Sequence, residues 1–267
     1  MKNKLKNEVN IEQVWNIETK DNIHTKRFIT FLYFFFLLFF SGMIVLFTIF
    51  IFAPGSNIYI NDQFNEALLG YVVLGSLFST ILFLIIALSK SKEIVNNFRE
   101  KITSKNIKIF VIYLSIFFIG AILISVFINL FYAVFNDSDL GSITNANQAA
   151  IENQIRSAPF IALLAFVVLG PLMEEIAFRY GIIGSFKNKT LGLFVSAFIF
   201  ASLHLVASIG TDNFKADLWT FPSYLFSGFI FGLLYIKTDN LVYSYGLHFI
   251  NNLIAYIVVI ISILTAT

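Results

Sequence analysis

Long apolar stretches alternate with short polar segments along the chain. A helix needs about 20 mainly apolar residues to cross the hydrocarbon core of a bilayer. Seven stretches approach or exceed this length, namely 28–53, 68–88, 109–135, 159–186, 190–208, 218–236 and 241–266. A break at Tyr245-Gly246 would divide the last stretch and give an eighth helix. The pattern therefore predicts an all-α fold, a polytopic membrane helix bundle of seven to eight transmembrane helices.

The composition supports a membrane protein and excludes several other classes. Hydrophobic residues make up 58% of the 267 residues and charged residues only 13%, whereas soluble domains are about a quarter charged. The absence of cysteine excludes disulfides and thiolate metal sites. The net charge of +2 gives no indication of nucleic-acid binding. We therefore expect a lipid bilayer, and no nucleic acid, among the partners.

The distribution of lysine and arginine predicts the orientation in the membrane, because basic loops face the cytoplasm. The basic segments are 1–27, 89–108, 187–189 and Lys237, whereas 54–66, 136–158 and 209–217 hold at most one basic residue each. Every second connection is thus the more basic one, which predicts a cytoplasmic N-terminus. The wealth of asparagine, lysine and isoleucine suggests an AT-rich bacterial genome, and hence the plasma membrane. Within 136–158, the part 145–156 predicts a short surface helix.

Ionisable and amide side chains lie within three of the apolar stretches. They are Glu174, Glu175, Arg179, His204, His248, Asn251 and Asn252. A charged side chain at the centre of a bilayer costs several kcal/mol, so such residues usually face the bundle interior and have a function.

The depth of these residues indicates a single site. At a rise of ~1.5 Å per residue from the basic end of each stretch, Glu174 lies roughly 18 Å deep and His204 roughly 21 Å. His248 and Asn252 lie roughly 11 and 17 Å deep. Three helices thus bring polar groups to a similar level, and we predict one site that opens toward the cytoplasm.

The spacing of these residues suggests different roles. Glu175 and Arg179 stand four residues apart, which suits an ion pair within one helix. Glu174 is rotated by about 100° from Glu175 and can point elsewhere. Alternative interpretations remain open: the pair is only a structural clamp, His204 is an interhelical hydrogen-bonding residue, and Asn251 is a packing amide.

Three short motifs resemble those of a known family. EEIAFR at 174–179, FASLH at 200–204 and HFINN at 248–252 are similar to the EExxxR, FxxxH and HxxxN elements of the intramembrane CAAX protease and bacteriocin-processing (CPBP) family. The resemblance covers roughly 159–256. Tyr180 stands where glycine commonly follows the arginine, and Gly181 comes one place later, so the local packing there is in question.

The resemblance implies an intramembrane glutamic endopeptidase and assigns its residues. Glu174 would activate water, His204 would help to hold it, and His248 with Asn252 would stabilise the oxyanion. Glu175 and Arg179 would give structural support. The implied organisation is a cytoplasmic tail at 1–27, an N-terminal transmembrane region of three helices at 28–158, and a catalytic transmembrane core at 159–267.

Several alternatives to this function remain. Two histidines and a glutamate could bind zinc, but HExxH is absent, so we favour a mechanism without a cofactor. The expected substrate is a membrane-associated peptide or protein near the cytoplasmic leaflet, in bacteriocin self-immunity or peptide-signal processing. The alternatives are a non-catalytic scaffold or immunity protein that binds a membrane partner, and a small proton-coupled transporter. The oligomeric state is not specified by the sequence.

Overall fold

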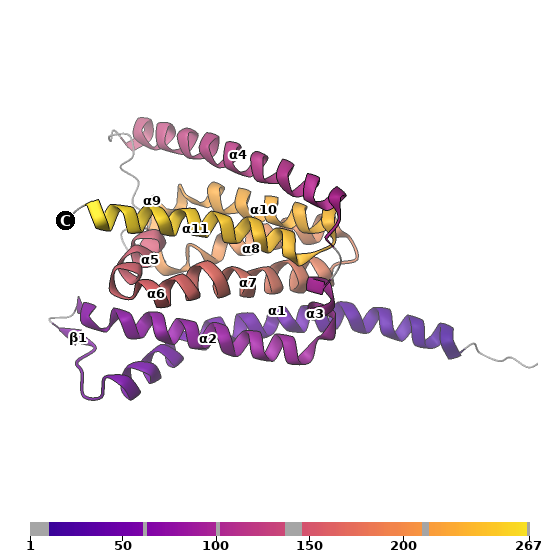
Figure 1. The fold of residues 1–267 in the computed structure, drawn as a ribbon, viewed down its shortest axis with the longest axis horizontal. Coiled ribbons are helices and arrows are strands. Elements are labelled where there is room, and N and C mark those ends of the chain that lie inside the picture. Colours follow the sequence, from indigo (N-terminus) through magenta and orange to yellow (C-terminus); the bar gives the residue numbers. More distant parts are fainter. Residues whose placement is uncertain (1–10, 61–62, 100–101, 137–145, 210–213, 266–267) are drawn as a thin grey trace, which may run out of the picture.

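The chain folds into a bundle of long helices (Figure 1). The computed structural model describes residues 11–60, 63–99, 102–136, 146–209 and 214–265. The long and short α-helices are α1 (Ile11–Phe52), α2 (Leu69–Lys90), α3 (Lys92–Arg99), α4 (Ser104–Asn136), α5 (Ala146–Ser157), α8 (Lys189–Leu203), α9 (Phe214–Leu218), α10 (Phe221–Thr238) and α11 (Leu241–Thr265). The minor elements are β1 (Tyr59–Ile60), β2 (Gln63–Phe64), η1 (Glu66–Leu68) and η4 (Val206–Ser208). The all-α prediction is confirmed apart from the two-residue strands.

One continuous helix, which we call the motif helix, contains the EExxxR element. It comprises α6 (Pro159–Ala162), the π-helical segment η2 (Leu163–Leu169), α7 (Gly170–Glu175) and a second π-helical segment η3 (Ile176–Ile183). Such wide turns are rare and occur frequently at functional sites. Both glutamates lie in the short α-helical stretch between the two π-helical segments.

Among the described residues, six helices are long and apolar enough to cross a membrane, so the chain is a multi-pass membrane protein. They are Asn22–Phe52, Glu66–Lys90, Ser104–Phe135, Pro159–Ile183, Phe214–Thr238 and Leu241–Thr265. The stretch 190–208 forms only the 15-residue helix α8, which at ~1.5 Å per residue is shorter than a bilayer core of about 30 Å. Helix α11 continues through Tyr245-Gly246 without a break, so the eight-helix alternative is wrong.

The structure bears on the predicted N-terminal tail and on the short helix predicted between two membrane spans. Of the predicted tail 1–27, residues 1–10 lie outside the described residues, and from Ile11 onward the chain belongs to α1. The short helix predicted at 145–156 is present as α5, which contacts α2, α6 and α11. Helices α3 and α5 lie at opposite ends of the bundle (Figure 1).

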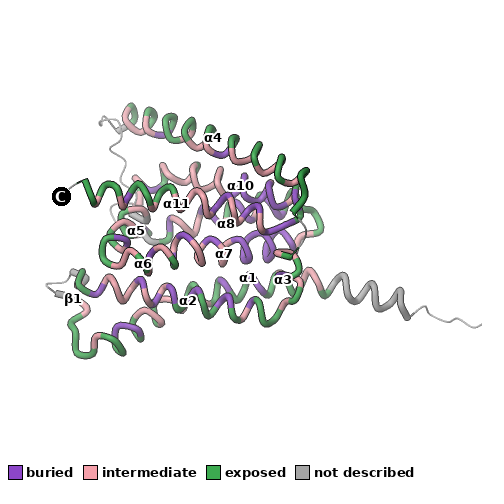
Figure 2. The backbone as a smooth tube through the Cα atoms, viewed as in Figure 1, coloured by how far each residue is buried: buried purple, intermediate pink, exposed green. Residues whose placement is uncertain are grey.

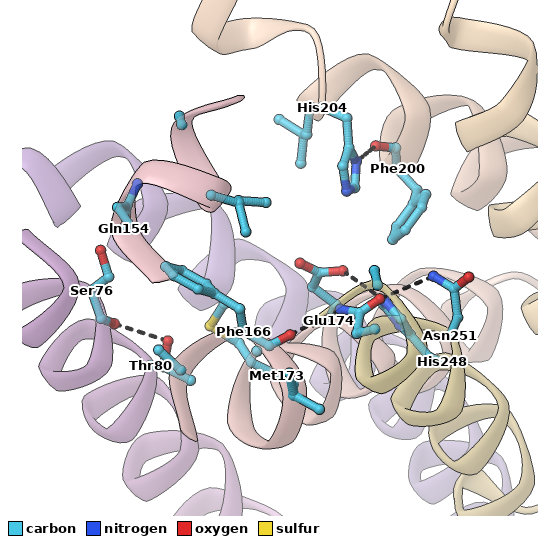
Figure 3. A pocket seen from close by; sticks show the side chains of 18 of the residues that line it. Ser76, Thr80, Gln154, Phe166, Met173, Glu174, Phe200, His204, His248 and Asn251 are labelled. Atoms are coloured by element: carbon cyan, nitrogen blue, oxygen red, sulfur yellow. Dashed lines mark hydrogen bonds and ion pairs between the residues drawn. The ribbon is translucent and has the colours of Figure 1, made fainter. Parts of the chain in front are cut away.

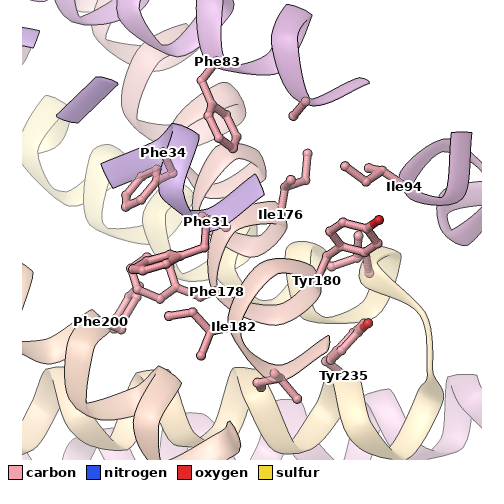
Figure 4. Close-up of a cluster of buried hydrophobic side chains, with 14 of the residues drawn as sticks. Phe31, Phe34, Phe83, Ile94, Ile176, Phe178, Tyr180, Ile182, Phe200 and Tyr235 are labelled. Atoms are coloured by element: carbon pink, nitrogen blue, oxygen red, sulfur yellow. The ribbon is translucent and has the colours of Figure 1, made fainter. Parts of the chain in front are cut away.

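Burial is uneven across the bundle (Figure 2). Buried residues concentrate in η3, α8 and α10, whereas α4 is largely exposed along its apolar length. The main core surrounds the motif helix with large side chains from α1, α2, α3, α8 and α10 (Figure 4), among them Phe31, Phe34, Phe83, Ile94, Phe178, Tyr180, Phe200 and Tyr235. Lipid would contact the exposed apolar surfaces, because they lie on membrane-spanning helices.

Tyr180 anchors the motif helix to the basic end of the bundle. Its hydroxyl donates to Glu93 Oε2 at 2.8 Å and lies 2.7 Å from Ser91 Oγ, and Glu93 forms an ion pair with Arg27. Gly181 follows because α1 passes close by: a methyl group there would lie 3.1 Å from Phe31 Cβ. The shift of glycine by one position therefore has a physical reason. Tyr180 reaches the polar side chains of Glu93 and Ser91, and the small Gly181 leaves room for α1.

Candidate active site

The ion pair predicted between Glu175 and Arg179 is present and entirely buried. Arg179 Nε and Nη2 donate to the two carboxylate oxygens of Glu175 at 3.0 and 3.2 Å, and neither residue is exposed to any extent. The remaining guanidinium nitrogen, Nη1, donates to Ser196 Oγ at 3.0 Å. Two parallel bonds of this kind fix both side chains and neutralise both charges. This half of the motif is a rigid, neutral unit.

Aromatic rings surround this ion pair. The guanidinium carbon of Arg179 lies 5.4 Å from the ring centre of Phe200 and 5.8 Å from that of Phe231. Cations are attracted to the faces of aromatic rings, more strongly where water is excluded. The phenylalanine of the FxxxH element thus stabilises the arginine of the EExxxR element.

His248 joins the ion pair to Glu174. Its Nδ1 lies 3.1 Å from Glu175 Oε1, and its Nε2 lies 3.7 Å from Glu174 Oε2. An ionised carboxylate only accepts hydrogen bonds, so Nδ1 must carry the proton that it shares with Glu175. The ring of His248 also stacks on Phe231 with centres 4.6 Å apart. These contacts hold Nε2 toward Glu174.

Glu174 occupies a different environment from its neighbour. Its side chain is 26% exposed, and it lines an internal cavity of about 490 Å³. Its Oε2 atom makes no hydrogen bond with any described residue. The 3.7 Å separation from His248 Nε2 is longer than a direct hydrogen bond. The side chain of Glu174 therefore lines the cavity, while its oxygen Oε2 is buried beside His248 without a hydrogen bond to the described residues.

His204 lines the same cavity with its ring fixed (Figure 3). Its Nδ1 lies 2.8 Å from the carbonyl oxygen of Phe200, so this nitrogen donates and Nε2 remains as the second site. The ring stacks on Tyr224 with centres 4.2 Å apart and an interplanar angle of 25°. Tyr224 was not identified from the sequence, because an isolated tyrosine in an apolar stretch gives no sign of which helix it contacts.

The amides of the HxxxN element are already engaged in part. Asn252 Nδ2 donates to the carbonyl oxygen of Phe166 at 2.9 Å, and Asn251 Nδ2 donates to Asn252 Oδ1 at 3.1 Å. Both residues line the cavity. One of the two hydrogens on Asn252 Nδ2 remains for another acceptor. Asn251 therefore both bonds to its neighbour, as the packing interpretation expects, and lies at the wall of the cavity.

The contact between Asn252 and Phe166 has a local cause. In the π-helical register of η2, Gly170 N–H bonds to the carbonyl of Ala165, five residues earlier. By the same register Phe166 would bond to residue 171, but Pro171 has no N–H. In lipid, such a freed carbonyl must find another donor. Asn252 supplies it, which ties α11 to the helix that carries Glu174.

The cavity brings together four of the predicted catalytic residues. Glu174, His204, His248 and Asn252 all line it, whereas the supporting residues Glu175 and Arg179 do not. Its other walls come from α1, α2, α5 and α10.

The opening of the site toward the cytoplasm stays a prediction, and the position of the cavity within the bundle bears on it. The cavity extends from Glu174 toward α5, away from the basic end with α3. The helical rise gives the depth of a side chain but not the direction in which space remains. Between Glu174 and α3 the bundle is filled by large buried side chains, including Phe83, Ile176 and Ile183.

A zinc site would require several ligands close together. Within the part of the chain that the structure describes, no three His, Asp or Glu side chains are grouped closely enough to hold a metal ion. Protein zinc sites typically use three or four such ligands.

Comparison with known proteins gives a family match over the region that forms this site. Residues 156–254 match the family described as type II CAAX prenyl endopeptidase Rce1-like. The chain is 29% identical over 194 residues to an uncharacterized protein of Mycoplasma capricolum, covering 68% of this chain and 54% of that protein. No solved structure is significantly similar to it.

Two further bacterial relatives carry peptidase names. The putative membrane peptidase YdiL of Bacillus subtilis is 32% identical over 120 residues, covering 42% of this chain and 46% of that protein. The membrane-embedded CAAX protease MroQ of Staphylococcus aureus is 33% identical over 87 residues, covering 32% of this chain and 34% of that protein. The chain thus spans about half the length of the first two relatives and a third of MroQ. Residues 156–254, which hold all three motifs, are therefore similar to the CAAX protease and bacteriocin-processing family.

Proposed function

We propose that this protein is a membrane-embedded endopeptidase that hydrolyses peptide bonds of a membrane-associated peptide or protein. One observation carries the proposal: the partly exposed side chain of Glu174 lines the cavity, beside a histidine whose ring is fixed by Glu175. A general base must lie within hydrogen-bonding reach of the proton that it takes, directly or through one water. A water in the cavity, held by the exposed part of the Glu174 carboxylate, would meet this requirement.

In this mechanism Glu174 takes a proton from the water as its oxygen attacks the peptide carbonyl. His204 Nε2, with its Nδ1 fixed on Phe200, accepts the water's second hydrogen bond. Glu174 then gives the proton to the leaving amine, so that one water and one amide become an acid and an amine. The carboxylate is regenerated.

The oxyanion requires hydrogen-bond donors that are already in place. Asn252 has one N–H beyond the bond to Phe166. His248 can donate from Nε2 only as the doubly protonated ring, because Nδ1 already shares its hydrogen with Glu175. We therefore propose that Asn252 is the first donor to the oxyanion, and that His248 joins it from Nε2 when its ring carries both hydrogens.

The mechanism needs no metal, and zinc is the competing proposal. Glu174, His204 and His248 are the side chains that a zinc ion would use, but among the described residues they are not grouped closely enough to hold one. Metal analysis by inductively coupled plasma mass spectrometry on purified protein separates the two. We expect less than one zinc in ten molecules and full activity after treatment with a chelator. Stoichiometric zinc, with activity lost on its removal, would overturn the glutamate mechanism.

We further propose that the basic end lies in the cytoplasm and that the protein resides in the plasma membrane. The cavity then faces the outer half of the bilayer, and the substrate is cut there. The proposed domain division changes in one respect. Because α1, α2 and α5 supply walls of the cavity, the region 28–158 takes part in the site of the catalytic core at 159–267.

The test is the Glu174→Gln variant in the native host or a heterologous bacterium. New N-termini of membrane proteins are compared by mass spectrometry between cells with wild-type and variant protein. We expect the products that depend on the wild type to disappear with Glu174→Gln and to persist with Glu66→Gln, an exposed glutamate outside the bundle core. Undiminished products with well-expressed Glu174→Gln would favour the non-catalytic scaffold instead.

A further inference from the structure

The cavity has a second wall that lies outside the family-matched region 156–254. Helices α1, α2 and α5 form this wall, and Figure 3 shows Ser76, Thr80 and Gln154 at the opposite side of the cavity from Glu174 and His204. The motifs place no requirement on these residues. Residues of this wall can therefore give this chain a substrate specificity that the family motifs do not set.

Ser79 is the exceptional residue of this wall. The neighbouring hydroxyls donate to carbonyls of their own helix, Ser76 to Val72 at 2.9 Å and Thr80 to Ser76 at 3.0 Å. Ser79 is only 8% exposed, yet its Oγ makes no hydrogen bond with any residue in the described ranges. Buried hydroxyls are nearly always paired, so an unpaired one needs an explanation. Ser79 lines the cavity with its oxygen buried, and a rotation about χ1 would bring the hydroxyl to a bound molecule that supplies the partner.

The charge of the cavity limits what that molecule can be. Among the described residues that line it, Glu174 is the only aspartate, glutamate, lysine or arginine. A ligand that carried a carboxylate or phosphate would find no lysine or arginine among these residues and would be repelled by Glu174. An uncharged ligand meets hydroxyls and amides together with apolar side chains such as Leu37, Leu38 and Val259.

We propose that Ser79 and Gln154 form a subsite that binds an uncharged internal stretch of polypeptide, rather than a free C-terminal carboxylate. This inference rests on the proposed peptidase function and specifies its substrate class. A peptide in apolar surroundings must find partners for its backbone N–H and C=O groups. Ser79 Oγ serves one of them, because a hydroxyl both donates and accepts. The scissile bond then lies toward Glu174.

Photo-crosslinking tests the subsite without requiring catalysis. In the full-length Glu174→Gln protein, Gln154→p-benzoylphenylalanine is compared with Asn153→p-benzoylphenylalanine, its exposed neighbour on the same helix. The probes are three 14-residue peptides of leucine, alanine, serine and glutamine. The first peptide has both termini blocked. The second also has blocked termini but carries two internal aspartates. The third ends in a free C-terminal carboxylate.

We expect the blocked neutral peptide to crosslink at position 154 at least tenfold more than at 153, and at least fivefold more than either acidic peptide. Equal crosslinking of all three peptides would overturn the charge argument. Absent crosslinking at 154, or crosslinking as strong at 153, would overturn the subsite.

A kinetic comparison tests Ser79 itself. With the blocked neutral peptide as a fluorogenic substrate, Ser79→Ala is expected to raise KM three- to tenfold and to change kcat less than twofold. The control is Ser89→Ala, at an exposed position of the same helix, with KM unchanged. Because Ser79 has no partner among the described residues, its removal should not lower the melting temperature. A lower melting temperature with unchanged KM would mean a structural role and contradict the proposal.

The experiments distinguish a failure of the subsite from a failure of catalysis by Glu174. If crosslinking follows the expected pattern but Glu174→Gln protein still cleaves peptide, the subsite stands and the proposed catalysis is wrong. If cleavage depends on Glu174 but crosslinking at 154 is absent, the catalysis stands and the subsite is wrong.

Discussion

Two neighbouring glutamates on the motif helix have opposite environments. Glu175 is fully buried and its two carboxylate oxygens are bound by Arg179, with His248 sharing one of them. Glu174 is partly exposed, faces the cavity, and has an oxygen with no hydrogen bond to any described residue. The same chemical group is thus a structural element on one face of the helix and a candidate base on the other. The surroundings decide the role.

The difference also separates the two kinds of damage that mutations should cause. On the packed face a substitution leaves a buried charge without its partner, and the fold weakens. On the cavity face a substitution removes a group whose bonds to the protein are few, and the fold persists. The predictions below test this separation, from the largest expected effect to the smallest.

Arg179→Ala should produce the largest loss of stability. It leaves the carboxylate of Glu175 buried and unpaired, which typically costs about 3–5 kcal/mol. We expect low abundance and a strongly reduced melting temperature in detergent, measured by differential scanning fluorimetry. Arg156→Ala, at an exposed position, serves as the control. The double variant Glu175→Gln/Arg179→Met removes both charges and should be more stable than Arg179→Ala. An equal or greater loss in the double variant would contradict the ion-pair account.

Asn252→Leu should weaken the attachment of α11 to the motif helix. The carbonyl of Phe166 loses its donor, and a buried unpaired group costs about 1–3 kcal/mol. Pro171→Ala restores an N–H that can serve this carbonyl, so the cost of Asn252→Leu should fall by at least half in that background. Unfolding of the four proteins of this cycle, followed in denaturant, measures the coupling. Strictly additive effects would show that Pro171 is not the cause of the contact.

Much of this architecture followed from the sequence, for identifiable reasons. Apolar length alone predicts α1, α2, α4 and α11, because few other structures tolerate such runs. The i, i+4 spacing predicted the ion pair of Glu175 and Arg179. Helix α8 was predicted as a full span because the apolar residues after Leu203 continue its pattern, although the helix itself ends there.

Other features depended on contacts that no local pattern records. The stack of Tyr224 on His204 and the free hydroxyl of Ser79 arise from helices distant in sequence. The direction of the cavity depends on which side chains fill the space near Phe83 and Ile183. Asn252 was predicted as a catalytic donor, and its bond to Phe166 depends on a π-helical register that hydropathy does not reveal.

Tyr224 should affect activity through the position of His204, with little effect on the fold. Tyr224→Leu removes the stacked ring, and we expect about a tenfold loss of kcat/KM, which corresponds to about 1.4 kcal/mol. Tyr224→Phe keeps the ring and should remain within threefold of wild type. Peptidase assays with the neutral fluorogenic peptide measure both. If the two variants lose activity equally, the stack is not what positions His204.

Tyr180→Phe should have the smallest effect, because it lies in the packed half, remote from the cavity. The variant loses the hydrogen bond to Glu93, and we expect a loss of stability of about 1 kcal/mol or somewhat more, since the acceptor is charged. Activity per folded molecule should not change. A loss of activity without a loss of stability would mean that the basic end of the bundle is coupled to the site.

The most direct test of the account compares Glu174→Gln and Glu175→Gln in the same two measurements, the melting temperature and the peptidase rate per folded molecule. We expect the two variants to show opposite effects: one loses activity and keeps its stability, and the other loses stability and keeps some activity. Glu174→Gln should melt within about 3 °C of wild type, as expected for a change below 1 kcal/mol, with a rate at least 1000-fold lower. Glu175→Gln should melt far lower and keep a measurable rate in the fraction that folds. An active Glu174→Gln protein, or a Glu175→Gln protein with wild-type stability and no activity, would contradict the division between the two glutamates.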